Sequence, residues 1–254
     1  MTRRRFYTSP ESFTPQRSSF SLDEDESRHL REVLRLRPGD QVYVFDGEGR
    51  EFLCEVETVE RRGAAVLKVR AEVEAARPES KLELTLALAL LKGEKFDLVV
   101  QKATELGVMR IAPVITKRAD VRLREERDAS KKRTARLRRL ALEAAKQSGR
   151  ARIPKIEQPV LFAELMERGR DNGPIVLFAE RDGDNLGEWK LAAGEGHTKL
   201  TALVGPEGGW EDAEIAYARA AGCQVVTLGG RILRAETAAI AVVVLLQHLF
   251  GDLN

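Results

Sequence analysis

Strand-like and helix-like segments alternate from residue 81 to residue 250, and this alternation most strongly constrains the fold. The run Leu82–Leu91 is almost continuously apolar, as in a strand that is buried on both faces. Phe96–Leu106 then has apolar residues at helical spacing and ends at Gly107, a typical helix terminator. The order repeats, with strands expected at 110–115, 174–178, 200–204 and 224–228 and helices at 130–148, 211–221 and 236–250. The pattern predicts an α/β domain with a mostly parallel sheet over residues 76–254.

Residues 1–75 follow a different pattern, made of short strands and Gly turns. Strands are expected at 41–45, 51–59 and 64–69, the first of which ends at the turn Asp46-Gly47. One helix is expected at 23–35. Several short strands with Gly turns indicate a small β-barrel. The segment 75–80, which contains Pro78 and lacks a periodic apolar pattern, is the expected boundary between two domains.

Positive charge is concentrated in one stretch of the chain. The whole chain has a net charge of +2, whereas residues 110–155 hold 16 Lys and Arg against five Asp and Glu, a net charge of +11. Such a block favours a polyanion such as nucleic acid as the partner, although a solvated helix face is an equally simple explanation. The candidate RNA-binding residues are those of this block and of the N-terminus: Arg3, Arg5, Arg118, Arg122, Lys131, Arg136, Arg139 and Arg150.

Several classes of protein are disfavoured by composition. Two cysteines do not make a disulfide framework, and three histidines without paired spacing argue against a zinc site, so we expect no metal. The basic N-terminus lacks the apolar segment of a secretory signal. The apolar run Ala238–Leu246 is too short to cross a bilayer, which needs roughly 20 residues. We therefore expect a soluble, cytoplasmic protein without a membrane partner.

Three expected strands end in unusual loops, and ligands of open α/β sheets bind beyond such strand ends. The loops are Phe178–Arg181, Gly205-Pro-Glu-Gly-Gly209 and Leu228–Ala238. The glycines of the second loop permit close backbone approach, but the loop matches neither a dinucleotide-binding nor a Walker motif. Ile232 and Leu233 are apolar within the third loop, so they need a cover, either another loop or a flat ligand. Glu236 or Thr237 could cap the helix that follows.

The two C-terminal loops resemble motifs of the RsmE-type 16S ribosomal RNA uracil-N3 methyltransferases of the SPOUT superfamily. The matching residues are Val204-Gly-Pro-Glu-Gly-Gly209 and Leu228-Gly-Gly-Arg-Ile-Leu-Arg-Ala-Glu-Thr-Ala238. Weaker similarities extend over the chain, at Arg5-Phe6, His29–Arg35, Lys92–Lys95, Gln101–Val108 and Glu143–Arg150. The resemblance implies a PUA-like β-barrel followed by an α/β methyltransferase domain with a C-terminal trefoil knot. It also implies S-adenosylmethionine as cofactor, a homodimer, and uridine 1498 of 16S rRNA within the small ribosomal subunit as the target.

The resemblance further implies which residues form the site. The cofactor would be held by the three loops, through Phe178, Glu180, Leu203, Val204, Gly205, Pro206, Glu207, Gly208, Gly209, Leu228, Gly229, Arg231, Ile232, Leu233, Thr237 and Ala238. On this interpretation Gly208 and Gly209 leave room for the cofactor. The catalytic candidates are Arg231, Arg234 and Glu236, because an arginine near the uracil carbonyls stabilises the anion that forms when N3 loses its proton.

Alternatives remain open for the residues and for the whole protein. Arg231 and Arg234 could form structural salt bridges with Glu236 or Glu207, and the general base could be Glu180, Glu207 or Glu236. Lys102 is spaced to pair with Glu105, with phosphate binding as its alternative. A non-catalytic RNA-binding or ribosome-assembly protein, or a related SPOUT enzyme that modifies another RNA or a ribose, could carry similar loops.

Overall fold

The chain forms two compact units. The computed structural model describes residues 3–12, 18–60, 63–119, 127–167, 173–193 and 198–253. The first unit comprises residues 1–79 together with 145–153, and the second comprises residues 80–144 together with 154–254. The sequence pattern places the boundary near residue 75 and does not indicate that a later segment joins the first unit. That segment belongs there because Arg150 pairs with Glu79 and its carbonyl oxygen accepts a hydrogen bond from Arg5.

The first unit is a five-stranded sheet with one short helix. Its strands are β1 (Arg5–Tyr7), β2 (Ser19–Ser21), β3 (Gln41–Phe45), β4 (Glu51–Thr58) and β5 (Val66–Val73), in the order β1-β3-β4-β5-β2. Only the pair of β1 and β3 is parallel. The expected helix at 23–35 is instead the short α1 (Glu24–Arg28) followed by a π-helical turn (His29–Val33). A single-turn 3₁₀-helix (Pro10–Ser12) completes the unit.

The core of the first unit is apolar and holds one cysteine. Phe6, Leu30, Val42 and Leu67 are fully buried in it. Burial raises the pKa of the Cys54 thiol to about 12, because the thiolate would have to give up its hydration. Cys54 is therefore a small apolar core group, as its place in an alternating strand predicts.

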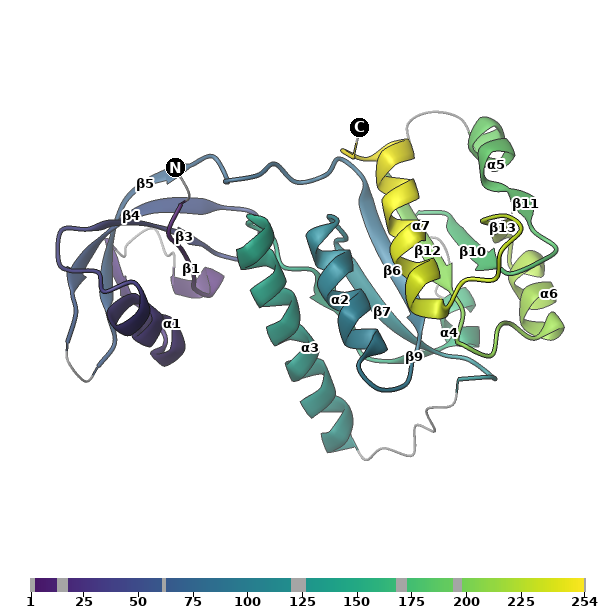
Figure 1. The fold of residues 1–254 in the computed structure, drawn as a ribbon, viewed down its shortest axis with the longest axis horizontal. Coiled ribbons are helices and arrows are strands. Elements are labelled where there is room, and N and C mark those ends of the chain that lie inside the picture. The colour runs from purple at the N-terminus through teal and green to yellow at the C-terminus, as the bar shows by residue number, and fades with distance from the viewer. Residues whose placement is uncertain are drawn as a thin grey trace. The chain divides into compact units, whose positions relative to one another are not determined.

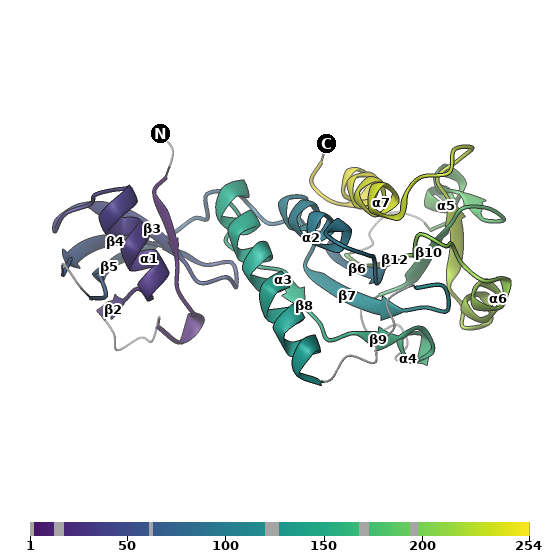
Figure 2. The same ribbon diagram turned by 60° about the horizontal axis from the view of Figure 1, so that its bottom comes forward.

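The second unit is built on an eight-stranded sheet whose strand pairs are all parallel. The strands are β6 (Glu83–Ala89), β7 (Arg110–Ile115), β8 (Lys155–Ile156), β9 (Val160–Leu161), β10 (Ile175–Ala179), β11 (Asp184–Asn185), β12 (Lys199–Val204) and β13 (Gln224–Thr227). Their order is β11-β13-β10-β12-β6-β7-β8, with β9 also paired to β7. Figure 2 shows β10, β12, β6 and β7 side by side. The predicted parallel sheet is confirmed, and Leu84, Leu86 and Leu88 of its central strand β6 are fully buried.

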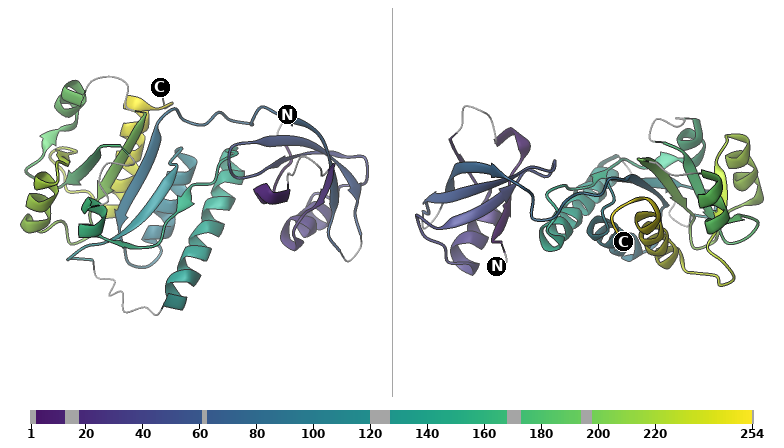
Figure 3. Two further views of the ribbon diagram at one scale, coloured as in Figure 1. Left: turned by 180° about the vertical axis from the view of Figure 1, so that it is seen from behind. Right: turned by 90° about the horizontal axis from the view of Figure 1, so that it is seen from above.

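Helices lie on both faces of this sheet. They are α2 (Lys95–Glu105), α3 (Arg127–Ser148), α4 (Phe162–Glu167), α5 (Leu186–Ala193), α6 (Asp212–Ala220) and α7 (Ala235–Phe250). Helix α7 packs beside α2 and against β12 and β6, as Figures 1 and 3 show. The short elements β8, β9, β11, α4 and α5 were not expected, because segments of two to eight residues carry too few apolar repeats for a periodic signal.

The strand order brings three loops together. Because β13, β10 and β12 are neighbours and parallel, their carboxyl ends lie at one edge of the sheet. The loops that follow Ala179, Val204 and Thr227 must therefore converge.

No helix in the part of the chain that the structure describes is long and apolar enough to span a membrane. Among the same residues, no group of His, Cys, Asp and Glu side chains could hold a metal ion.

Candidate functional site

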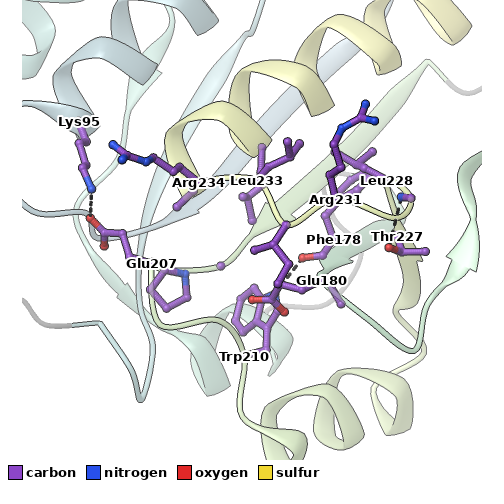
Figure 4. A pocket seen from close by; sticks show the side chains of 18 residues that line it. Lys95, Phe178, Glu180, Glu207, Trp210, Thr227, Leu228, Arg231, Leu233 and Arg234 are labelled. Atoms are coloured by element: carbon purple, nitrogen blue, oxygen red, sulfur yellow. Dashed lines mark hydrogen bonds and ion pairs between the residues drawn. The ribbon is translucent and has the colours of Figure 1, made fainter.

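A pocket of about 370 Å³ lies where the three loops converge (Figure 4). It is formed by the ends of β10, β12 and β13, the first residue of α2 and the first turn of α7. Its lining consists of Lys95, Phe178, Ala179, Glu180, Val204, Gly205, Pro206, Glu207, Trp210, Thr227, Leu228, Gly229, Arg231, Ile232, Leu233, Arg234, Ala235 and Ala238. Both its volume and its mixed lining are typical of small-molecule sites, which measure roughly 300–1,000 Å³.

Packing of Trp210 shapes one wall of the pocket. The indole is buried, and its Nε1 donates a hydrogen bond of 2.9 Å to the carbonyl oxygen of Phe178 at the end of β10. The ring lies against Gly205, where an added Cβ would come within 2.9 Å of it. Gly205 is therefore required by the packing of Trp210, and the tryptophan joins the ends of β10 and β12 into one wall.

The next two glycines of this loop make room for protein side chains. Gly209 has φ +69°, a backbone conformation that favours glycine, and a Cβ there would overlap a carboxylate oxygen of Glu180. At Gly208 a Cβ would press on Arg118, which donates a hydrogen bond of 3.2 Å to the Gly208 carbonyl. In this structure Glu180 and Arg118 take the space beside these two glycines, and the role of the glycines beside a cofactor stays a prediction.

Charged side chains gather at one end of the pocket. Lys95, Glu207 and Arg234 lie there in Figure 4, whereas Leu228, Thr227 and Arg231 lie toward the opposite end. The Lys95 Nζ donates a hydrogen bond of 3.1 Å to Glu207 Oε1 and lies 3.9 Å from Glu236 Oε2. One ammonium thus joins the start of α2, the loop after β12 and the first turn of α7.

The two arginines of the third loop are exposed, and neither guanidinium has a partner among the described residues. The alternative to a catalytic role for these arginines is a structural salt bridge with Glu207 or Glu236. Both carboxylates contact Lys95 instead. Arg231 and Arg234 therefore contribute uncompensated positive charge to the lining of the pocket.

Of the residues that the sequence predicts for the site, five do not line the pocket and the others do. Leu203 is fully buried in the hydrophobic core of the second unit. Gly208 and Gly209 face Arg118 and Glu180. Glu236 and Thr237 belong to the first turn of α7 but lie outside the lining. The helix N-cap is Arg234, so the prediction that Glu236 or Thr237 caps this helix is wrong.

Five residues of the lining were not among the residues expected in the site: Lys95, Ala179, Trp210, Thr227 and Ala235. Four of them adjoin expected residues in the three loops, so the sequence signal was their position beside a strand end. Lys95 belongs to a helix that precedes these loops by more than 70 residues. The sequence places it in the segment Lys92–Lys95, which resembles the start of the family's catalytic domain, but assigns it no role in the pocket.

The candidate RNA-binding residues fall into two groups. Lys131 and Arg139 are exposed on α3, Arg118 is exposed beside the loop after β12, and Arg136 pairs with Asp97 of α2. Arg3, Arg5 and Arg150 lie in the first unit instead. Arg5 and Arg150 are nearly buried in ion pairs with Glu51 and Glu79, and Arg3 also contacts Glu51. Arg122 lies outside the described residues.

The contacts of Arg5 and Arg150 show a structural role for both side chains. The Arg5 guanidinium also donates to the carbonyl oxygens of Lys146 and Arg150, so its donors serve the packing of the first unit. Arg150 forms a two-point pair with Glu79. A nearly buried arginine with such partners has most of its donors engaged within the protein, so contact of Arg5 and Arg150 with RNA is disfavoured by this arrangement.

Comparison with known proteins decides the family. Residues 78–247 match the model of an RNA methyltransferase domain, and residues 22–69 match that of an RNA methyltransferase PUA domain. The ribosomal RNA small subunit methyltransferase E of Rickettsia conorii is 31% identical over 90% of this chain and 89% of its own length. The enzyme of the same name from Synechocystis sp. is 32% identical over 87% of this chain and 70% of its own length.

The chain belongs to the RsmE family of ribosomal RNA small subunit methyltransferases.

Two solved structures are similar to this chain over the whole fold. The ribosomal RNA small subunit methyltransferase E of Neisseria gonorrhoeae, solved with S-adenosyl methionine bound, is 33% identical, with a TM-score of 0.85 over 100% of both chains. A Legionella pneumophila protein solved with the cofactor SAM is 29% identical, with a TM-score of 0.86 over 99% of this chain and 100% of that chain. The PUA-like unit and the parallel-sheet unit of this chain are thus both those of an RsmE protein.

Proposed function

We propose that this protein methylates N3 of a uracil in 16S rRNA, at the family's uridine 1498, with the assembled small ribosomal subunit as substrate. The methyl donor is S-adenosylmethionine, as in the two solved relatives. One observation carries the proposal: the loops that hold the family's motifs converge on a single pocket, which has an apolar part and a charged end.

The residues of the pocket fit S-adenosylmethionine. Phe178, Leu228 and Leu233 offer apolar surface of the kind that a flat adenine ring needs. The backbone amides of Leu228 and Leu233 donate to no protein acceptor within the described residues, so they are available to a polar ligand atom. Glu207 and Arg234 provide partners for the ammonium and carboxylate of a methionine moiety. When bound, the cofactor supplies a methyl group on a positively charged sulfur, which is a good leaving group.

The remaining chemistry falls to the residues of this chain. The N3–H of a neutral uracil is a poor nucleophile, so the proton must leave and the resulting negative charge spreads over N3 and the two adjacent carbonyl oxygens. Arg234 and Arg231 each carry five N–H donors without a partner among the described residues, and such donors stabilise an anion that develops beside them. Glu207 is the carboxylate of the charged end that lines the pocket, and it is the proposed proton acceptor.

The RNA is proposed to bind on the exposed face of α3. Lys131, Arg138 and Arg139 are exposed there, without an ion-pair partner among the described residues. Contacts of this kind bind phosphates and set affinity rather than sequence choice. Arg118 is proposed to contact the RNA closer to the pocket, because it is half-exposed beside Gly208.

Two further properties of the family are proposed for this chain. Strand β13 lies beyond β10 in the sheet, yet the next helix, α7, packs on β12 and β6. The connection through 228–234 thus returns over the strand ends, which supports a trefoil knot.

Leu98 of α2 and Val244 of α7 are exposed apolar residues on neighbouring helices, which supports a homodimer formed through this face. The enzyme is proposed to act in the cytoplasm, where the small ribosomal subunit is found.

A methyl-transfer assay tests the proposed reaction. Purified protein is incubated with labelled S-adenosylmethionine and unmodified small subunits, naked 16S rRNA or tRNA, and the labelled nucleoside is mapped by mass spectrometry. We expect 3-methyluridine at one position of the rRNA in the small subunit and much less label in the naked RNAs. Label at another atom or in tRNA, or none despite measured cofactor binding, would contradict the proposal.

A further inference from the structure

Lys95 is the one ammonium in the pocket lining, and two carboxylates hold it. Its Nζ lies 3.1 Å from Glu207 Oε1 and 3.9 Å from Glu236 Oε2, and about a third of the side chain stays exposed. Lys102, on the same helix, has a similar exposure but pairs with its neighbour Glu105 and does not line the pocket. Two residues of one type on one helix thus have different surroundings, and only Lys95 faces the pocket.

Glu236 contributes to the site through Lys95. Its side chain is 13% exposed, lies outside the pocket lining, and its Oε2 atom has no hydrogen-bond partner within the described residues. A nearly buried carboxylate without hydrogen bonds is stabilised chiefly by a nearby cation. The cation at hand is Lys95, so the two carboxylates fix the position of its ammonium between α2 and α7. The other cationic group at this end of the pocket is Arg234.

We propose that Lys95 is a catalytic residue that binds a uracil carbonyl next to N3 and stabilises the imide anion, an inference that rests on the proposed function. A lysine ammonium has three N–H donors and no lone pair. It therefore cannot take the N3 proton, but it can donate to the oxygen on which negative charge develops. Glu236 is a positioning residue for it, and Glu207 both holds its ammonium and accepts the N3 proton.

The step balances with the groups already named. The N3–H bond breaks and the proton passes to the Glu207 carboxylate, while the Lys95 ammonium donates a hydrogen bond to the adjacent carbonyl oxygen. The N3 electron pair then forms the bond to the methyl carbon, as the bond between that carbon and the sulfonium breaks and its electron pair stays on sulfur. The proton leaves Glu207 for water at the open rim of the pocket.

The test compares Lys95→Met with Lys102→Met, which removes a lysine of the same helix that does not line the pocket. For each full-length variant we would measure kcat and KM for unmodified small subunits from pH 7 to pH 9.5, affinity for S-adenosylmethionine by calorimetry, and thermal unfolding. At pH 7 we expect Lys95→Met to lower kcat about 100- to 1,000-fold, the range for removing one donor from an anion-stabilising site. Cofactor affinity should change less than threefold, and Lys102→Met should match the wild type.

The pH dependence of kcat distinguishes a catalytic role of Lys95 from a structural one. As the pH rises, uracil loses its N3 proton in solution and needs less help from a cation, so the deficit of Lys95→Met should shrink by about tenfold per pH unit. A deficit that stays constant with pH, or a comparable loss of cofactor affinity, would overturn the proposal and make Lys95 a structural or cofactor-binding residue.

A double variant tests whether the loss of activity in Lys95→Met comes from repulsion between Glu207 and Glu236. Removing Lys95 alone leaves Glu207 and Glu236 uncompensated, and their repulsion could displace the loops. In Lys95→Met combined with Glu236→Gln this repulsion is absent, so recovery of activity would show a purely structural role, whereas continued loss supports catalysis. A wild-type protein that makes no 3-methyluridine would contradict the proposed function, whereas an active wild type with an active Lys95→Met would contradict only this inference.

Discussion

Single residues of the pocket owe their identity to contacts that are remote in sequence. Gly205 lies beside Trp210, whose indole is tied to Phe178 at the end of another strand. A methyl group at residue 205 would press on this ring, and the ring cannot move without breaking its buried hydrogen bond. The glycine is therefore required by a tryptophan and not by the cofactor alone.

Gly205→Ala should destabilise the second unit by about 1–3 kcal/mol, the usual cost of overpacking a well-packed site. Affinity for S-adenosylmethionine should fall with it, because the wall formed by Trp210 moves. Gly230→Ala is the control, since a Cβ there meets no atom within 4 Å and the backbone is not left-handed. Urea unfolding and calorimetry check both variants, and equal stability of the two would show that Trp210 tolerates the methyl group.

At the scale of elements, α3 has one buried face and one basic face. Leu137, Ala141 and Ala144 are buried at helical spacing, whereas Lys131, Arg138 and Arg139 point to solvent. The helix ends within the first unit, where Lys146 pairs with Glu26 and where Arg5 and Arg150 are held by carboxylates. The positive block of the sequence therefore divides into a solvent-exposed part and a structural part.

The triple variant Lys131→Ala, Arg138→Ala and Arg139→Ala should bind the small subunit more weakly. Each lost phosphate contact should reduce the slope of log affinity against log salt by about one. Unfolding temperature should stay within about 2 °C of the wild type, because exposed charges away from partners contribute little. Filter binding from 50 to 300 mM salt measures the slope, and an unchanged slope would place the RNA on another surface.

At the scale of the molecule, two units share one chain, and every residue that lines the pocket belongs to the second. A ligand stabilises only the state that binds it. S-adenosylmethionine at 100 times its dissociation constant should thus add about 2.7 kcal/mol to the stability of the second unit. In calorimetric scans, the transition of that unit should move upward while that of the first unit stays in place. A shift of both transitions together would show that the units unfold as one.

The sequence by itself determined the alternation of strands and helices, the parallel sheet and the loops that form most of the pocket. These follow from local rules: apolar periodicity sets which face of an element is buried, and glycines mark where a turn can form. The motifs of 204–209 and 228–238 were sufficient to identify the family, because each is a continuous run of residues.

Only the tertiary structure decided which side chains meet. Lys95 and Glu207 are 112 positions apart, and nothing local to either residue indicates the other. Their contact depends on the order β13-β10-β12-β6 and on the packing of α7 beside α2. The same reason explains why Arg5 and Arg150 are buried ion-pair partners while Lys131 and Arg139 face solvent. A charge in a sequence shows its sign, but its surroundings, and therefore its role, arise when distant segments pack together.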